Sequence, residues 1–152
     1  MEPKGNSSGR GVRALLWWVL AVAYLAVIFI AAWRPEFGAE AARQIVSRLF
    51  PTLGPATIHG IVVGVRKSLH FLGYAAFAII LANAFLGTIP KPRSARPVVT
   101  ACVIAGLAAV SLAVFDEALQ ARFPHRSGNP RDIGIDILGI AVGVALRLRS
   151  AL

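Results

Sequence analysis

The sequence contains few charged residues. Only 15% of its 152 residues are Asp, Glu, Lys or Arg, whereas about a quarter of an average soluble domain is charged. The charges stand in short patches between long apolar runs, and a helix needs about 20 mostly apolar residues to cross a bilayer. Runs of this length exclude the alternating strands of a membrane β-barrel. We therefore predict an all-α, polytopic membrane bundle of four transmembrane helices with one interfacial amphipathic helix.

Cysteine and acidic residues are also scarce. The single cysteine, Cys102, excludes an internal disulfide, and its apolar neighbours predict a small, buried hydrophobic side chain. Seven acids against 16 Lys and Arg give a net charge of +9, a value that often indicates nucleic-acid binding. Here the basic residues flank the apolar runs, where they would meet anionic lipid. We expect a membrane lipid or a lipid-linked substrate as partner and no nucleic acid. Self-association into a homo-oligomer stays open.

The predicted transmembrane helices follow four apolar stretches: residues 14–33, 67–89, 98–115 and 132–146. The first stretch ends in Trp33-Arg34-Pro35 and lacks the short core and small-residue cleavage site of a signal peptide. We therefore expect it to be retained. Residues 1–12, rich in Gly and Ser, form a predicted disordered tail, and residues 13–150 form one membrane domain.

An interfacial segment is predicted between the first two transmembrane helices, at residues 36–65. Apolar side chains recur there every four residues, which predicts an amphipathic helix on the membrane surface: Phe37, Ala41, Ile45 and Leu49. A helix packed on the transmembrane helices is the alternative. Residues 56–65 are apolar but too short to cross the bilayer, so a re-entrant or interfacial segment is expected.

The distribution of basic residues does not by itself decide the orientation, because the two sides hold equal numbers. The loop from Lys91 to Arg96, however, is short and purely basic. Loops of this kind stay on the cytoplasmic side. We therefore predict a cytoplasmic N-terminus.

Three helix ends that share one side of the membrane carry unusual polar residues. The second predicted helix opens with Lys67, His70 and Tyr74, whose spacing of three and four residues favours one helix face. The third ends with three polar residues within five positions: Asp116, Glu117 and Gln120. Ionisable groups at membrane depth are costly and often mark function. Helix-end anchoring or structural salt bridges are the alternative explanation.

The fourth predicted helix carries a stripe of acids and glycines. Asp132, Asp136, Gly139 and Gly143 recur every three or four residues, so they lie on one face. Glycines at this spacing allow a neighbouring helix to approach closely. The two carboxylates are therefore expected to point toward the same helix contact.

These residues, in this order, resemble the VanZ-like family. The matching positions are Lys67, His70 and Tyr74, then Asp116, Glu117 and Gln120, then Pro124 and Arg126, and finally Asp132, Gly139 and Gly143. Two positions depart from the family pattern: Asp136 replaces an Asn, and His125 occupies a turn position that is often small. The resemblance covers about residues 60–147.

The resemblance implies a place in the bacterial cell envelope, as a multi-pass protein of the inner membrane. Relatives are associated with lower susceptibility to teicoplanin-type glycopeptides. A lipid-head-group enzyme has been proposed for the wider group.

Two functions of different classes are consistent with these residues. The first is a hydrolase or transferase acting at the outer interface on a lipid-linked, phosphate-bearing substrate. Its predicted catalytic residues are His70, Asp116, Glu117, Gln120 and Asp132, and its predicted substrate-binding residues are Lys67, Tyr74, Arg126 and Asp136. Lys67 and Arg126 would clamp the phosphate, and His70 would act as general base or nucleophile with Asp116 or Glu117 as its partner.

The second function is a non-catalytic envelope protein that binds a lipid-linked precursor or a partner protein. A transporter is a third option, although no pair of discontinuous helices supports it. The sequence identifies no cofactor and assigns no metal site. Mg²⁺ bound through four carboxylates stays an alternative: Asp116, Glu117, Asp132 and Asp136.

Overall fold

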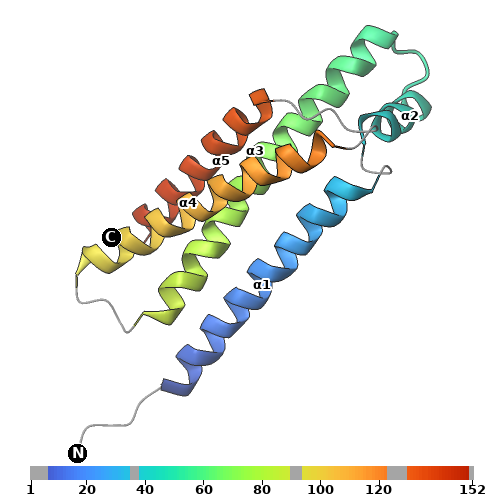
Figure 1. Cartoon of the computed structure of the whole chain (residues 1–152). Helices are drawn as coiled ribbons and strands as arrows, with labels where there is room; N and C mark the ends of the chain where they lie inside the picture. The colour runs from blue at the N-terminus through green and yellow to red at the C-terminus, as the bar shows by residue number, and fades with distance from the viewer. Residues whose placement is uncertain (1–6, 35–37, 90–93, 123–129, 151–152) are drawn as a thin grey trace, which may run out of the picture.

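Five helices make up the described part of the chain, which comprises residues 7–34, 38–89, 94–122 and 130–150 of a computed structural model. They are α1 (Ser7–Trp33), α2 (Ala39–Leu49), α3 (Pro55–Thr88), α4 (Ala95–Gln120) and α5 (Pro130–Arg149). These ranges contain no strand, so the all-α prediction is confirmed. In Figure 1, α1, α3, α4 and α5 run alternately up and down as an elongated bundle, and α2 lies at one end of it.

Three of these helices, α1, α3 and α4, are long and apolar enough to cross a membrane. Four such helices were predicted, and three are found among the described residues. The helix that falls short is α5, because its 20 residues include five charged ones: Arg131, Asp132, Asp136, Arg147 and Arg149. Its charges, rather than its length, set it apart.

The predicted boundaries need correction at two helices. Residues 56–65 are neither re-entrant nor separate, because they form the first turns of α3, which begins at Pro55 rather than at Lys67. Proline is well tolerated at the first turn of a helix, and no proline follows within α3. At 34 residues, α3 is about 51 Å long, more than the roughly 30 Å of a hydrocarbon core. Residues 7–12, predicted to be part of a disordered tail, belong to α1.

The predicted amphipathic segment contains a helix, α2, with its apolar side chains uncovered. Ile45 is 57% exposed and Leu49 67% exposed, although both are large and apolar. On the polar side, Arg43 and Glu40 form an exposed ion pair of 3.6 Å. Phe37, the first residue of the predicted apolar stripe, lies outside the described residues. Among the described residues, none therefore covers Ile45 and Leu49 on α2.

The packing of the bundle depends on small residues. Alanines and one cysteine form its centre: Ala78, Ala82, Cys102, Ala105, Ala109 and Ala113. A Cβ on Gly139 would overlap the backbone carbonyl of Phe71, and one on Gly143 would overlap that of Ala75. The backbones of α5 and α3 are therefore in direct contact, as the glycine stripe predicts. Close backbone approach is how helices associate in lipid, where apolar burial gives little drive.

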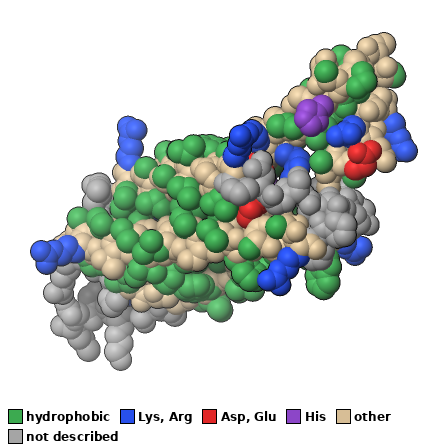
Figure 2. Space-filling model, turned by 45° about the horizontal axis from the view of Figure 1, so that its top comes forward, with side chains coloured by type: hydrophobic (Ala, Val, Ile, Leu, Met, Phe, Trp, Pro, Cys, Tyr) green, Lys and Arg blue, Asp and Glu red, His purple; other side chains and the backbone are tan. Residues whose placement is uncertain are grey.

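The surface of the bundle is apolar between two polar ends. Large exposed side chains such as Leu15, Val19, Leu72, Leu107 and Leu138 cover its length, and Figure 2 shows this apolar band on one face, with Lys and Arg toward both ends. One end, where α4 ends and α5 begins, holds four buried acids and is called the carboxylate end below: Asp116, Glu117, Asp132 and Asp136. The other end, where α1 and α4 begin and α3 and α5 finish, is called the opposite end.

Candidate functional site

A cleft of about 360 Å³ opens at the carboxylate end between α1, α3 and α4. One side is apolar and comes mainly from α1, with Val27, Ile28 and Ala31. The other side is polar and comes from α3 and α4: Arg66, His70, Tyr74, Asp116 and Gln120. The cleft can thus hold a molecule with an apolar part and a polar part.

His70 and Asp136 form a pair between α3 and α5. Nδ1 of His70 lies 3.0 Å from Oδ1 of Asp136, whose side chain is only 1% exposed. The pair forms because Gly139, one turn along α5, lets the backbone approach α3 at Phe71, next to His70. With the carboxylate accepting from Nδ1–H, Nε2 is the ring atom left to accept a proton or attack a substrate.

Asp116 is the centre of a second polar group. Its Oδ2 accepts hydrogen bonds from the Tyr74 hydroxyl, at 3.2 Å, and from Nε2 of Gln120, at 3.0 Å. Asp116 and Gln120 share a face of α4 because they are four residues apart. All three side chains are buried. The bonds therefore fix Asp116 in the wall of the cleft.

Three buried oxygens in this cluster lack a hydrogen-bond partner within the described ranges. They are Oδ1 of Asp116, Oε1 of Gln120 and Oδ2 of Asp136. Nearly all buried polar atoms in folded proteins are hydrogen-bonded, so each such atom calls for an explanation. For Asp116 and Gln120, which line the cleft, the explanation that fits is a bound donor, namely a hydroxyl, an amine or water.

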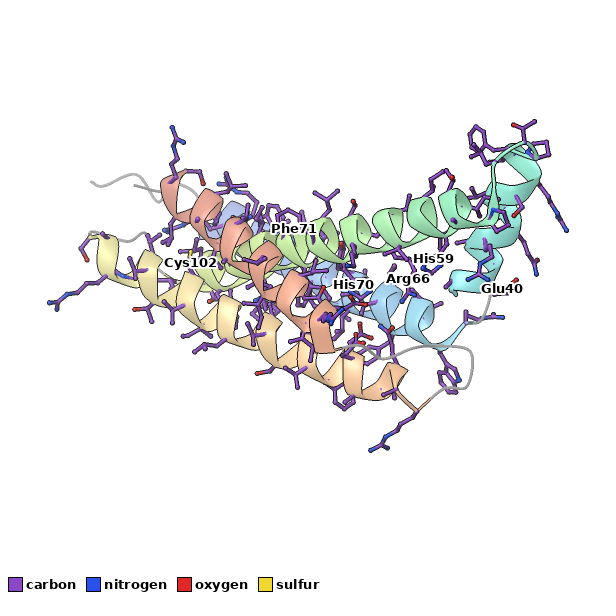
Figure 3. All side chains as sticks on the ribbon, turned by 90° about the horizontal axis from the view of Figure 1, so that it is seen from above. Glu40, His59, Arg66, His70, Phe71 and Cys102 are labelled. Carbon is purple, nitrogen blue, oxygen red and sulfur yellow. The ribbon has the colours of Figure 1, made fainter. Side chains whose placement is uncertain are left out.

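The cation of the cleft is Arg66, one turn before His70 on α3. Arg66 is half-buried and lines the cleft, whereas its neighbour Lys67, the predicted binding residue, is exposed and does not line it. Figure 3 shows Arg66 and His70 on the same side of α3 and Cys102 far away, toward the other end of the bundle. Cys102 is fully buried, as predicted for a small apolar side chain.

The remaining predicted residues fall into two groups. Glu117 and Asp132 are buried and lie close enough to His70 to interact with it electrostatically, but neither lines the cleft. Arg126, with Pro124 and His125, lies outside the described residues. Among the predicted residues that the structure describes, His70, Tyr74, Asp116 and Gln120 line the cleft, whereas Lys67 does not.

A metal centre is not assembled in the described part of the chain. There, no three His, Cys, Asp or Glu side chains lie close enough to hold an ion. The carboxylates of Asp116 and Asp136 are instead bonded to Tyr74, Gln120 and His70. Mg²⁺ prefers several oxygen ligands in octahedral geometry, and these described carboxylates do not offer them.

Arg66 and the wall from α1 were not predicted as parts of the site. Arg66, His70 and Tyr74 stand four residues apart, a spacing as typical of one helix face as the spacing that favoured Lys67. The sequence gives no sign that α1 lines the cleft through Tyr24, Val27 and Ile28. In an apolar helix, a residue that faces lipid cannot be distinguished by its type from one that faces a cleft. Tyr24 also donates a hydrogen bond to the carbonyl of Gly73, at 3.1 Å.

Together these features define a helical bundle of the membrane-protein type, with a cleft at one end that is lined by a buried acid, a histidine and an arginine. The chain belongs to the VanZ/LLP1 family, whose model matches residues 16–149. The resemblance inferred from the motifs is thereby confirmed, and the match also includes α1 and α2, where no motif was found. No curated protein and no solved structure matches the chain.

Proposed function

We propose that this protein acts in the bacterial inner membrane, at the outer membrane–water interface, on a lipid-linked or phosphate-bearing head group. One observation carries the proposal: a single cleft combines an apolar wall, an arginine, a histidine paired with a buried acid, and unpartnered acceptors. The apolar wall suits a lipid chain. The polar wall suits its head group.

The four-helix topology predicted from the sequence is part of this proposal. In α5, the charged Asp132 and Asp136 are buried, whereas exposed residues such as Leu138 and Leu146 are apolar. A helix with its charges turned inward can cross a bilayer as a member of a bundle. With a cytoplasmic N-terminus, the carboxylate end then faces outward, and α2 lies at the outer interface with Ile45 and Leu49 in the lipid.

The cleft offers different chemistry at different depths. Arg66, one turn further out than His70, presents a guanidinium fork that matches the oxygens of a phosphate. Deeper, Oδ1 of Asp116 and Oε1 of Gln120 are acceptors without a partner among the described residues, which suits hydroxyl or amino groups and not a second phosphate. We therefore expect a head group with its phosphate toward Arg66 and its donors toward Asp116.

His70 is the group best placed for a reaction at that phosphate. In hydrolysis or transfer, the oxygen of water or of an acceptor alcohol forms the new bond to phosphorus. Nε2 of His70 takes its proton. The bond from phosphorus to the leaving oxygen breaks, and that oxygen takes a proton from solvent. Asp136 holds the imidazole in the required orientation, as the acid of a catalytic triad does.

The test is a drug-susceptibility and lipid-profile assay in a bacterial host without its own homologue. Wild type, His70→Ala and Asp116→Asn are compared at matched membrane levels, with Ser111→Ala as control because its exposed hydroxyl bonds only within α4. We expect wild type and the control alone to change teicoplanin susceptibility and a lipid-linked species. If all four behave alike, the cluster is structural, and the non-catalytic binding function takes its place.

A further inference from the structure

A second cavity, of about 300 Å³, lies at the opposite end of the bundle. It opens between the start of α1 and the finishing turns of α3 and α5, and three arginines line it: Arg10, Arg13 and Arg147. Its other walls are Trp17, Asn83, Leu86, Gly87 and Ile89. Neither the family match nor the proposed reaction gives this cavity a role.

Arg147 is fixed in the cavity by neutral groups. Its Nε donates a hydrogen bond of 2.7 Å to Oδ1 of Asn83, and its Nη1 donates one of 3.0 Å to Oγ of Ser150. Neither partner carries a charge, so these contacts orient the guanidinium without neutralising it. A guanidinium held in this way presents its remaining donors with little loss of freedom on binding.

The two arginines of α1 are placed by a close helix contact. A Cβ on Gly87 would stand 2.9 Å from Cα of Ala14, so α1 and α3 touch there backbone to backbone. Arg10, Arg13 and Trp17 follow one another at spacings of three and four residues and therefore share the face of α1 that lines the cavity.

No acid balances this charge in the described part of the chain. The described acids are Glu40, on α2, and the four that define the carboxylate end. None of the three arginines forms an ion pair with them. With no described acid among them, the three cations repel one another, and an anion placed between them removes that repulsion.

We propose that this cavity binds the phosphate head group of an anionic membrane lipid. Basic pockets between membrane helices bind such head groups, and a volume of about 300 Å³ lies at the lower end of the range for small-ligand sites. Trp17 suits the interface, where one edge of its ring is apolar and the other is wet. The exposed side chains of Leu16 and Leu20 extend the same helix as an apolar surface, along which acyl chains can lie.

The experiment measures lipid-dependent thermal stability of the full chain purified in dodecyl maltoside. The unfolding temperature is followed while dioleoyl phosphatidylglycerol, dioleoyl phosphatidylcholine or inorganic phosphate is added. The variant is Arg10→Gln/Arg13→Gln. Its control, Arg96→Gln/Arg149→Gln, removes two exposed charges at the same end but outside the cavity. Without added lipid, both should unfold close to the wild-type temperature, because all four side chains are exposed.

We expect phosphatidylglycerol to stabilise the wild type at lower concentration than phosphatidylcholine does. At about fivefold per arginine, the variant should need roughly 30-fold more phosphatidylglycerol than the control. Equal responses to the two lipids, or equal losses in variant and control, would overturn the proposal. If inorganic phosphate stabilised the protein as much as phosphatidylglycerol does, the proposed lipid ligand would be wrong, and the cavity would be a site for soluble phosphate. A failure of the His70 assay above leaves this result untouched, because the cavity lies at the other end.

Discussion

The cleft at the carboxylate end and the cavity at the opposite end are built between neighbouring helices of one bundle but differ in what they bury. The cleft combines one acid, a histidine and an arginine, and hydrogen bonds fix the acid and the histidine. The cavity has arginines and one amide, with no described acid. Mixed donors and acceptors can move protons, whereas cations alone can only hold an anion. The difference therefore separates a candidate reaction site from a candidate binding site.

The largest expected effect is at the His70–Asp136 pair. Replacing Asp136 by Asn keeps the side-chain shape but removes the carboxylate that orients Nδ1. If His70 is the general base, turnover of the lipid-linked species should fall about 100-fold or more. The same purified variant should still respond to phosphatidylglycerol like the wild type. If Asp136→Asn lost both turnover and the response to phosphatidylglycerol, the two ends would be coupled, and the cleft and the cavity would not be separate sites.

The next effect concerns the glycine contact that holds α5 on α3. Gly139→Ala places a methyl group against the carbonyl of Phe71, so we expect a loss of about 1–3 kcal/mol in the free energy of unfolding. Gly134→Ala is the matched control on the same helix, because a Cβ there meets nothing within 4 Å. Reversible unfolding in mixed detergent micelles measures both. Equal stability of the two variants would show that the close contact is absent.

Two adjacent cations on α3 provide a smaller but more selective test. Arg66→Gln should raise the substrate concentration needed for half-maximal turnover about tenfold or more, since a charged hydrogen bond contributes about 1.5–3 kcal/mol. Lys67→Gln, which removes the exposed neighbour, should change it about twofold at most, as exposed ion pairs contribute little. The reverse order would favour the residue that the sequence pattern predicted.

The smallest expected effect is at the Tyr74 hydroxyl. Tyr74→Phe removes its hydrogen bond to Asp116, and hydrogen bonds between membrane helices contribute about 0.6 kcal/mol on average. Tyr24→Phe, which removes a bond to a backbone carbonyl, serves as the comparison. A loss in Tyr74→Phe well above that in Tyr24→Phe would indicate that Asp116 depends on this donor. Thermal unfolding of the purified variants measures the difference.

Much of the bundle follows from local patterns in the sequence. Long apolar runs predict helices of membrane type. The spacing of Gly139 and Gly143 predicts a close helix contact on the side of Asp136, and the structure shows that the partner is α3. These features are local because each depends on residues within a few turns of one helix. The start of α3 could not be predicted in this way, since residues 56–65 are too few to identify as part of a longer helix.

The composition of the cleft could be predicted only in part. Helical spacing groups His70 with Tyr74 and Asp116 with Gln120, and the structure joins these two pairs. The choice between Arg66 and Lys67 depends on a rotation of about 100° around the axis of α3. That choice is settled by where α1 packs, which is a contact between distant parts of the chain.

If α5 crosses the bilayer as proposed, biogenesis of the bundle cannot follow a simple order in which each helix enters the lipid alone. With five charges in 20 residues, α5 would partition poorly from the translocon as an isolated segment. The backbone of α3 at Phe71 and Ala75 provides a docking surface for its glycines, and α3 leaves the ribosome first. Insertion of α5 and completion of the His70–Asp136 pair would then be one event, so a half-inserted chain would carry no working site.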